Sequence, residues 1–361
     1  MATRQGRKPD ISCPQSDISY LLGHDISDRR TASSPYKSRW LLFFAALIGL
    51  TACADLHETH KARSNSPEAS LQPAVNPAVS LAPDGANPNA IVVFPEQLVP
   101  TGATSSENTA ALNKTLAAFK VRVRSDDFSA LESWVKENPS SPWTVAVLTN
   151  LGLLDYDAGY FSRAIEAYET AWSMGRHVKE YKAKLIVDRA VGELARMHAR
   201  LGHTERLESL FTELAGRPLQ GAATELVTSS REALWMMRNE PDTAFLCGPT
   251  ALRTVTGIVN QTKQSAEVLA DIKSGTHGTT LADLDRLAGM AKVGYRAAFR
   301  SPGAPLPLPV VIHWKVNHFA AVTESVNGRY RISDPTFGRE LWVTEEALDA
   351  ESSGFYLIPE S

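Results

Sequence analysis

The chain has 361 residues, of which 43% are hydrophobic, and its 37 Lys and Arg residues nearly balance its 40 Asp and Glu residues. The formal net charge of -3 excludes a strongly basic chain of the kind that binds nucleic acids through its overall charge, so we expect no nucleic-acid partner. The length and the hydrophobic content allow two modest folded domains.

Residues 1–53 are predicted to be an N-terminal extension that ends in an export signal. The basic stretches TRQGRK and DRRTASSPYKSRW precede the apolar run LLFFAALIGL at residues 41–50. A transmembrane helix needs about 20 apolar residues, so this run is too short to be one. A basic region followed by a short apolar region is typical of a secretory signal.

The four residues LTAC at positions 50–53 resemble the bacterial lipobox, in which the cysteine carries lipid and becomes the mature N-terminus. We therefore predict lipidation at Cys53, because two acyl chains anchor a protein stably. Ala54, rather than an aspartate, follows this cysteine. The prediction is thus a lipid-anchored protein of the bacterial cell envelope, on the periplasm-facing side of the outer membrane. The alternative is an ordinary secretory signal or a short signal anchor without lipid.

Residues 54–105 are predicted to be a flexible linker. They are rich in Pro, Ala, Ser and Asn and lack a sustained apolar period. One short apolar piece within them, IVVFPEQLVP at residues 91–100, is suited to docking on a folded domain, although nothing in the sequence requires it.

Residues 106–238 are predicted to be an all-α domain, since their apolar residues recur at spacings of three and four. The stretch TNLGLLDYDAGYFSRAIEAYETAW resembles a tetratricopeptide repeat, with a small-residue crossing at Leu151-Gly152 and a turn at Ala158-Gly159. The packing face of its second helix comprises Ala164, Tyr168 and Ala171.

A second, more degenerate unit surrounds Gly202, and its first helix is extended over about residues 177–201. Flanking helices are expected at residues 107–136 and 219–238, because about three such repeats are needed to bury a continuous core. Two functions stay open for this tetratricopeptide-like domain. It is either a concave scaffold that binds a peptide or protein partner, or a structural arm that holds the next domain.

Residues 239–361 are predicted to form an α+β domain. Two helical segments, CGPTALRTVTGIVN and TTLADLDRLAGMAKVG, precede the strand-like runs LPVVIHW, HFAAVTES, RYRISD and ELWV. The first of these helices begins at Cys247, directly before Gly-Pro.

Cys247 is the candidate nucleophile. The chain has only two other cysteines, Cys13 and Cys53, so removal of the signal and lipidation would leave Cys247 as the sole thiol of the mature protein. The partial positive charge and free N–H groups of a helix N-terminus favour a thiolate. Simple burial is the alternative reason for a lone cysteine in an exported protein.

His318 and Asp334 are the candidate partners of this thiol. His318 begins an apolar strand, and Asp334 ends the next strand, after the turn at Asn327-Gly328. Neighbouring antiparallel strands can bring the two together, so that the aspartate accepts one imidazole N–H and the other ring nitrogen faces the thiol.

The motifs CGPTAL, GTTLADLDRLA, LPLPVVIHWKVNHFAAV and ISDP, in this order, resemble the bacteriocin-processing, double-glycine peptidase family, a papain-like group of cysteine peptidases. The resemblance covers roughly residues 241–360. It implies a papain-like domain with Cys247 as nucleophile, His318 as general base and acid, and Asp334 as the residue that orients His318.

One position departs from the family pattern. A glutamine that donates to the oxyanion usually lies six residues before the nucleophile, where this chain has Pro241, and the nearest upstream glutamine is Gln220. Loss of one oxyanion donor typically costs a factor on the order of a hundred to a thousand in rate. We expect either Asn239 to replace it or the backbone N–H of Cys247 to act almost alone.

Together these patterns predict a lipid-anchored cysteine peptidase that acts on a peptide or protein substrate, such as an exported peptide or leader, without a metal or cofactor. The alternative is a non-catalytic peptide-binding module with a degenerate peptidase fold, which the missing glutamine favours. Three further residues are expected to be structural: His313 as a half-buried strand residue, and Trp314 and Phe319 as core.

Overall fold

The computed structural model describes residues 87–259, 268–270, 272–337 and 340–360. The predicted signal, the lipobox with Cys53, Cys13 and the first part of the predicted linker lie outside these residues. Among the described residues, no helix is both long enough and apolar enough to span a membrane.

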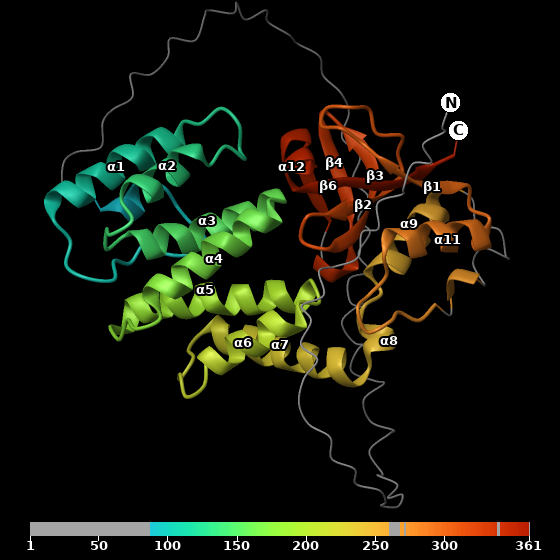
Figure 1. Ribbon diagram of the computed structural model, residues 1–361. Helices are drawn as coiled ribbons and strands as arrows, with labels where there is room; N and C mark the ends of the chain where they lie inside the picture. Colours follow the sequence, from blue (N-terminus) through green and yellow to red (C-terminus); the bar gives the residue numbers. More distant parts are fainter. Residues whose placement is uncertain (1–86, 260–267, 271, 338–339, 361) are drawn as a thin grey trace, which may run out of the picture. The chain divides into compact units, whose positions relative to one another are not determined.

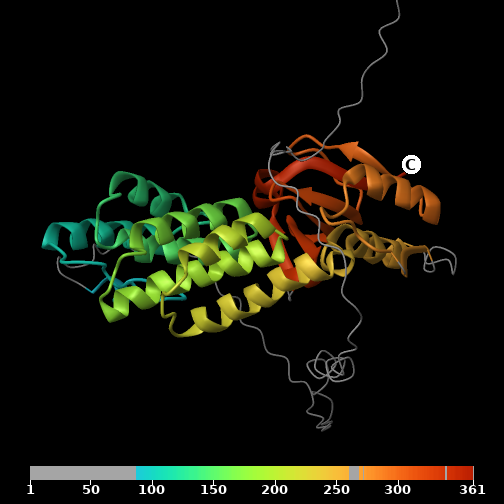
Figure 2. The ribbon, with the colours of Figure 1, turned by 60° about the horizontal axis from the view of Figure 1, so that its bottom comes forward.

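The helical part of the chain, called the arm below, comprises the helices before residue 240 (Figure 1). These are η1 (Pro88–Ala90), α1 (Ser106–Lys120), α2 (Ser129–Glu137), α3 (Thr144–Ala158), α4 (Phe161–Gly175), α5 (Tyr181–Arg200), α6 (Thr204–Glu213) and α7 (Ala222–Asn239). The all-α prediction for this region is confirmed, with the first flanking helix split into α1 and α2. Figure 2 shows α3 to α7 lying side by side in a layered stack.

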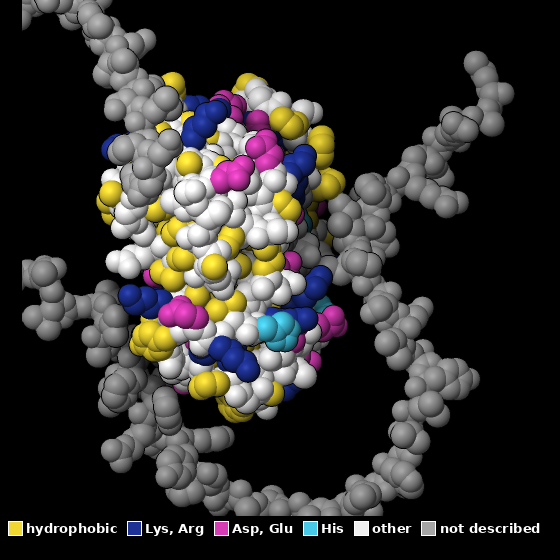
Figure 3. All heavy atoms as spheres, turned by 90° about the vertical axis from the view of Figure 1, so that its left-hand side faces the viewer, with side chains coloured by type: hydrophobic (Ala, Val, Ile, Leu, Met, Phe, Trp, Pro, Cys, Tyr) yellow, Lys and Arg dark blue, Asp and Glu magenta, His cyan; other side chains and the backbone are white. Residues whose placement is uncertain are grey.

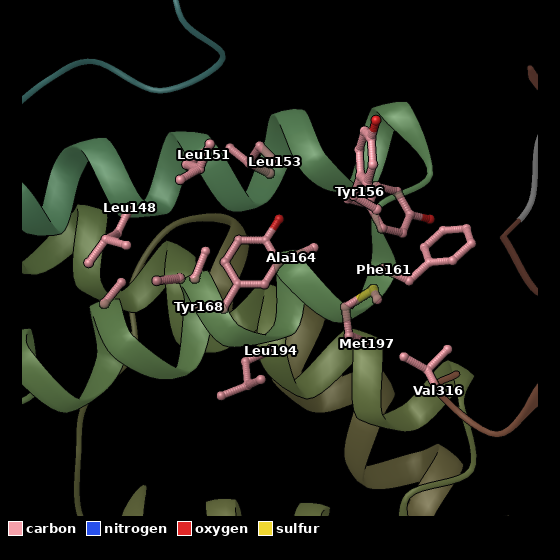
Figure 4. Close-up of a cluster of buried hydrophobic side chains, with 14 of the residues drawn as sticks. Leu148, Leu151, Leu153, Tyr156, Phe161, Ala164, Tyr168, Leu194, Met197 and Val316 are labelled. Carbon is pink, nitrogen blue, oxygen red and sulfur yellow. The ribbon is translucent and has the colours of Figure 1, made fainter. Parts of the chain in front are cut away.

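The α3–α4 pair has the close crossing that the sequence predicts. A Cβ atom built on Gly152 of α3 would lie 2.5 Å from a ring carbon of Tyr168 on α4, so only glycine allows the two helices to approach this closely. Ala164, Tyr168 and Ala171 of α4 are fully buried, and Figure 4 shows Tyr168 and Ala164 among leucines of α3 and α5.

The C-terminal part contains one antiparallel sheet of strand order β1-β6-β2-β3-β4-β5. Its elements are α8 (Pro241–Ala244), α9 (Cys247–Val259), α11 (Leu281–Ala291), β1 (Tyr295–Phe299), β2 (Val310–Trp314), β3 (His318–Val326), β4 (Arg329–Ser333), η2 (Pro335–Phe337), β5 (Leu341–Thr344), α12 (Glu345–Glu351) and β6 (Ser352–Pro359). The α+β prediction is confirmed. The predicted strands correspond to β2 to β5, whereas β1 and β6 were not predicted.

The middle of the sheet, around β2, is buried on both faces. Successive side chains of a strand point to opposite faces, and β2 divides its side chains accordingly. Val311 belongs to a buried cluster with α9 and α11, whereas Val310, Ile312 and Trp314 belong to a cluster that continues into the arm. The sheet and the arm therefore share one hydrophobic core.

The N-terminal end of α4 contacts the last residue of α12, the helix that precedes β6. Helix N-termini leave backbone N–H groups without partners inside the helix. Here the Ser162 N–H and hydroxyl each donate to a carboxylate oxygen of the buried Glu351, both at 2.8 Å. Burial, the largest influence, raises the pKa of Glu351 despite these hydrogen bonds.

The described part of the predicted linker, residues 87–105, lies against the arm rather than extending freely. The buried Asn150 of α3 binds both backbone groups of Glu96: it accepts from the N–H at 2.9 Å and donates to the carbonyl at 3.0 Å. Leu98 is buried and Phe94 stacks on Phe119. The apolar piece at residues 91–100 thus docks on a folded domain, and the arm begins before residue 106.

One outer face of the described part carries charged side chains of both signs. Figure 3 shows Lys and Arg side chains interspersed with Asp and Glu side chains there, without a continuous patch of one charge. This face therefore gives no electrostatic preference for a strongly charged partner.

Candidate active site

The N-terminal end of α9 places the Cys247 thiol. Cys247 is the first residue of the helix, and Pro249 fits in the first turn because no helical hydrogen bond needs its missing N–H there. A Cβ on Gly248 would lie 3.1 Å from the side chain of the buried Leu284 on α11. The Gly-Pro pair therefore permits both the sharp helix start and the close packing of α9 on α11.

His318 and Asp334 meet at the same end of two neighbouring strands, as the sequence predicts. His318 is the first residue of β3, and Asp334 follows the last residue of the neighbouring β4. The Nε2 atom of His318 lies 2.6 Å from Oδ2 of Asp334, and both side chains are buried. The other carboxylate oxygen accepts the backbone N–H of Thr336 at 2.8 Å, so both oxygens of Asp334 are occupied.

The thiol of Cys247 completes this chain of hydrogen bonds. Its sulfur is hydrogen-bonded to the side chain of His318 and accepts the backbone N–H groups of Phe319 and Gly248. Because Asp334 occupies Nε2, Nδ1 is the ring nitrogen that faces the sulfur. The structure thus brings together the three side chains that the sequence predicts.

The surroundings favour a charged thiol–imidazole pair. Burial of the thiol is the largest influence and opposes ionisation, but the hydrogen bond and charge of His318 with the two backbone N–H groups lower the pKa of Cys247. Burial also opposes charge on His318. Its hydrogen bonds to Asp334 and Cys247 and the negative charges of both outweigh burial and raise the pKa of His318 to about 10.

A small pocket opens beside the thiol. Its volume is about 140 Å³, and Leu246, Cys247, Ala251, Phe319 and Thr336 are among its lining residues. Pockets for whole small-molecule ligands usually measure about 300–1,000 Å³, so this one accommodates the atoms around a single bond rather than a whole small molecule.

Two expectations about neighbouring residues are confirmed, and one needs correction. His313 is a half-buried residue of β2, with Nδ1 2.9 Å from the hydroxyl of Ser353, and Trp314 is fully buried core. Phe319 is core too, but it also lines the pocket and its N–H reaches the thiol. This dual role was not predicted, because every residue offers a backbone N–H and no pattern in the sequence marks the one that reaches the thiol.

Pro241 and Asn239 are the two residues that bear on the missing oxyanion glutamine. Pro241 starts the four-residue helix α8, and Asn239 does not take over the oxyanion role. The Asn239 side chain is exposed, and its amide donates to the Trp235 carbonyl of its own helix at 2.7 Å. The first N–H groups of a helix have no partner within it, so the Cys247 N–H is the donor that α9 offers to an oxyanion.

Phe337 is a residue of the site that the sequence reading did not identify. It follows Asp334 in η2, is buried, and meets the ring of His318 edge to face at a centroid distance of 5.5 Å. No pattern in SDPTFG distinguishes this phenylalanine from ordinary core. Within the residues that the structure describes, no group of three or more His, Cys, Asp and Glu side chains is placed to hold a metal ion.

Comparison with known proteins assigns the C-terminal part to a family. Residues 243–361 match the model of the Peptidase C39 family. No curated protein matches the chain.

Two solved structures are similar to about a third of this chain. One is a double glycine motif protease from an AMS/PCAT transporter in complex with the leader peptide; the identity is 21%, the match covers 31% of this chain and 81% of that one, and the TM-score is 0.26. The other is the N-terminal peptidase C39 like domain of the toxin secretion ATP-binding protein from Vibrio parahaemolyticus, with 14% identity, coverage of 32% and 97%, and a TM-score of 0.26. On the family match, the C-terminal part of this chain, from residue 243 onward, is a peptidase C39 domain that follows an all-α arm.

Proposed function

We propose that this protein is a cysteine peptidase that cleaves a peptide bond through a thioester on Cys247. The observation that carries the proposal is the continuous hydrogen-bonded chain from the Cys247 thiol through His318 to Asp334, at the start of a helix and beside an open pocket. Nucleophile, base and orienting group in mutual contact are the signature of nucleophilic catalysis.

The geometry supports the following reaction. The thiolate of Cys247 attacks the scissile carbonyl carbon, and the carbonyl oxygen takes the negative charge beside the Cys247 N–H. As the C–N bond breaks, His318 donates its Nδ1 proton to the leaving amine, and a thioester remains. His318 then accepts a proton from a water molecule, whose oxygen attacks the thioester, and the departing thiolate regains its imidazolium partner. Asp334 keeps Nε2 protonated throughout.

The substrate and the location belong to the same proposal. We infer an exported peptide or leader as substrate and a lipid anchor at Cys53. Near the N-terminus, basic stretches are followed by an apolar run that ends in LTAC, as in an exported lipoprotein. The anchor would hold the peptidase at the periplasm-facing outer membrane of the cell envelope, where it meets exported chains.

The pH dependence of thiol reactivity tests the catalytic pair. We expect the rate at which iodoacetamide modifies Cys247 to fall less between pH 8.5 and pH 6.5 than that of an ordinary thiol, because the pKa of this thiol is lowered and the imidazolium of His318 persists up to a pKa of about 10. An ordinary thiol, with a pKa near 8.5, would slow about fiftyfold over the same interval. Site-resolved mass spectrometry of the full chain separates Cys247 from the other cysteines.

The control for this experiment is His318→Ala, which should restore the ordinary fiftyfold dependence. The charged and titratable groups that influence His318 or are influenced by it are Asp334, Cys247, His203 and His313. A thiol of ordinary pH dependence in the unchanged protein would contradict the peptidase proposal and favour a peptide-binding module.

Metabolic labelling tests the anchor. We expect radioactive or clickable palmitate to label the protein, and Cys53→Ala to remove the label, because the acyl chains would be attached at this cysteine. Cys13→Ala, the matched control, should keep the label. A label that survives Cys53→Ala would refute lipidation at this site.

A further inference from the structure

The hairpin turn that leads into His318 is held by the arm. Residues 315–317 connect β2 to β3, and Asn317 has a φ of 57°, so the chain reverses sharply just before His318. Val316 is buried, and its carbonyl oxygen lies 3.2 Å from Nε2 of His203, between α5 and α6. Figure 4 shows the Val316 side chain next to Met197 of α5.

The hydrogen-bonding roles of His203 follow from its partners. A carbonyl only accepts, so the Nε2–H of His203 donates to Val316. The Nδ1 atom of His203 lies 3.0 Å from Nδ1 of the buried His198. Burial lowers the pKa of both histidines, that of His198 to about 3, so both rings are neutral near pH 7. His198 therefore donates to His203, and His203 donates to the turn.

A second line of contacts reaches the same histidine. Phe161 of α4 stacks on Phe337, with ring centroids 4.7 Å apart and an interplanar angle of 9°. Phe337 in turn meets the ring of His318 edge to face. Phe161 also packs against Trp314, which is paired with His318 across β2 and β3. The arm thus contacts the backbone carbonyl of Val316, which precedes His318, and the ring of Phe337, which packs against the His318 ring.

We propose that the arm is part of the peptidase machinery, with His203 as a positioning residue that sets His318 against Cys247 by donating to the Val316 carbonyl. This rests on the proposed function. Of the two functions that the sequence leaves open for the arm, the contacts support the structural one and make it more specific: the arm holds the base in place. An imidazole held loosely would share its proton less well with the thiol, because such hydrogen bonds depend on distance and direction.

The test compares His203→Phe, which replaces the imidazole by an aromatic ring without nitrogen atoms, with His203→Gln, whose amide still has an N–H to donate. We expect His203→Phe to slow iodoacetamide modification of Cys247 at pH 6.5 on the order of tenfold, the worth of one such hydrogen bond. At high pH, where the thiolate forms without help, the rate should be unchanged. His203→Gln should recover most of the loss at pH 6.5.

Two controls separate positioning from general damage. His177→Phe changes an exposed histidine of the arm and should leave the rate unchanged. In a His318→Ala background, His203→Phe should cause no further loss, because His203 acts only through His318. If His203→Phe does not fold, Phe161→Leu, which removes the ring that stacks on Phe337, should give the same pH-dependent loss.

The outcomes distinguish this inference from the proposed function. Suppose that the pKa of Cys247 is lowered in the unchanged protein and stays equally low in His203→Phe. This result would overturn the positioning role of His203 but not the proposed function. A loss that is equal at all pH values, or that persists in the His318→Ala background, would also overturn it, since it would show a structural effect. An ordinary thiol pKa in the unchanged protein would contradict both.

Discussion

Cys247→Ala and His318→Ala are each expected to reduce peptide hydrolysis by at least a factor on the order of ten thousand. The two side chains form one hydrogen-bonded unit, and removal of either leaves no activated nucleophile. For the same reason the double variant should be no slower than either single variant. Initial rates on a peptide substrate, with folding checked by circular dichroism, measure the effect.

Asp334→Asn should retain partial activity, which makes it the informative third member of this series. Asp334 accepts two N–H groups, from His318 and from Thr336, one on each oxygen. An asparagine has one oxygen and one NH₂ group, so it keeps only one of these two bonds. If its oxygen faces His318, the imidazole stays oriented and activity survives in part.

His177→Ala is the matched control for His318→Ala, because His177 is an exposed histidine of the arm. It should hydrolyse the substrate at the unchanged rate. Full activity of Cys247→Ala would refute the proposed mechanism outright, and additive losses in the double variant would show that the two side chains do not act as a unit.

Gly159→Ala is expected to lower the free energy of unfolding by about 2–5 kcal/mol, a large part of the 5–15 kcal/mol typical of a folded protein. Gly159 ends α3 with a φ of +90°, a conformation that disfavours any side chain. Its Cβ would also overlap with Cγ1 of the buried Val343 on β5. Urea unfolding followed by circular dichroism measures the loss.

The chain offers controls that separate the two causes. Gly216 has a φ of +76° but no atom within 4 Å of a built Cβ, so Gly216→Ala should cost only the conformational part, about 1–2 kcal/mol. Val343→Ala removes the obstructing methyl group, so Gly159→Ala should cost less in its presence. Equal costs for Gly159→Ala and Gly216→Ala would show that the α3–α4 turn is not tightly packed against β5.

The peptidase part was predicted well where the signal is local. The start of α9 at Cys247 follows from Gly-Pro, and β2 to β5 follow from apolar runs separated by turn residues. Two strands were missed for local reasons as well. YRAAF contains alanines, which have low strand propensity, and SSGFYLIP begins with Ser-Ser-Gly, which indicates a turn rather than a strand.

The proximity of His318 and Asp334 was predictable because both lie at the ends of adjacent antiparallel strands joined by a short turn. Their contact with the thiol required the resemblance to a known family as well as the residues. The replacement for the oxyanion glutamine was not predictable. Whether Asn239 reaches the site depends on where α7 ends, and the structure directs its amide back onto α7.

The sequence by itself determined the helices of the arm, the strands β2 to β5 and the proximity of His318 to Asp334, because periodicity, turn residues and strand ends act over short distances along the chain. Only the tertiary structure decided that the arm and the sheet share one core, that Asn150 binds the backbone of Glu96, and that His203 supports the turn before His318. Asn150 lies 54 positions from Glu96 along the chain, and His203 lies 113 positions from Val316. In both pairs a side chain binds the backbone of a distant residue. Every residue offers such backbone groups, so no pattern of side chains along the sequence marks which of them will meet.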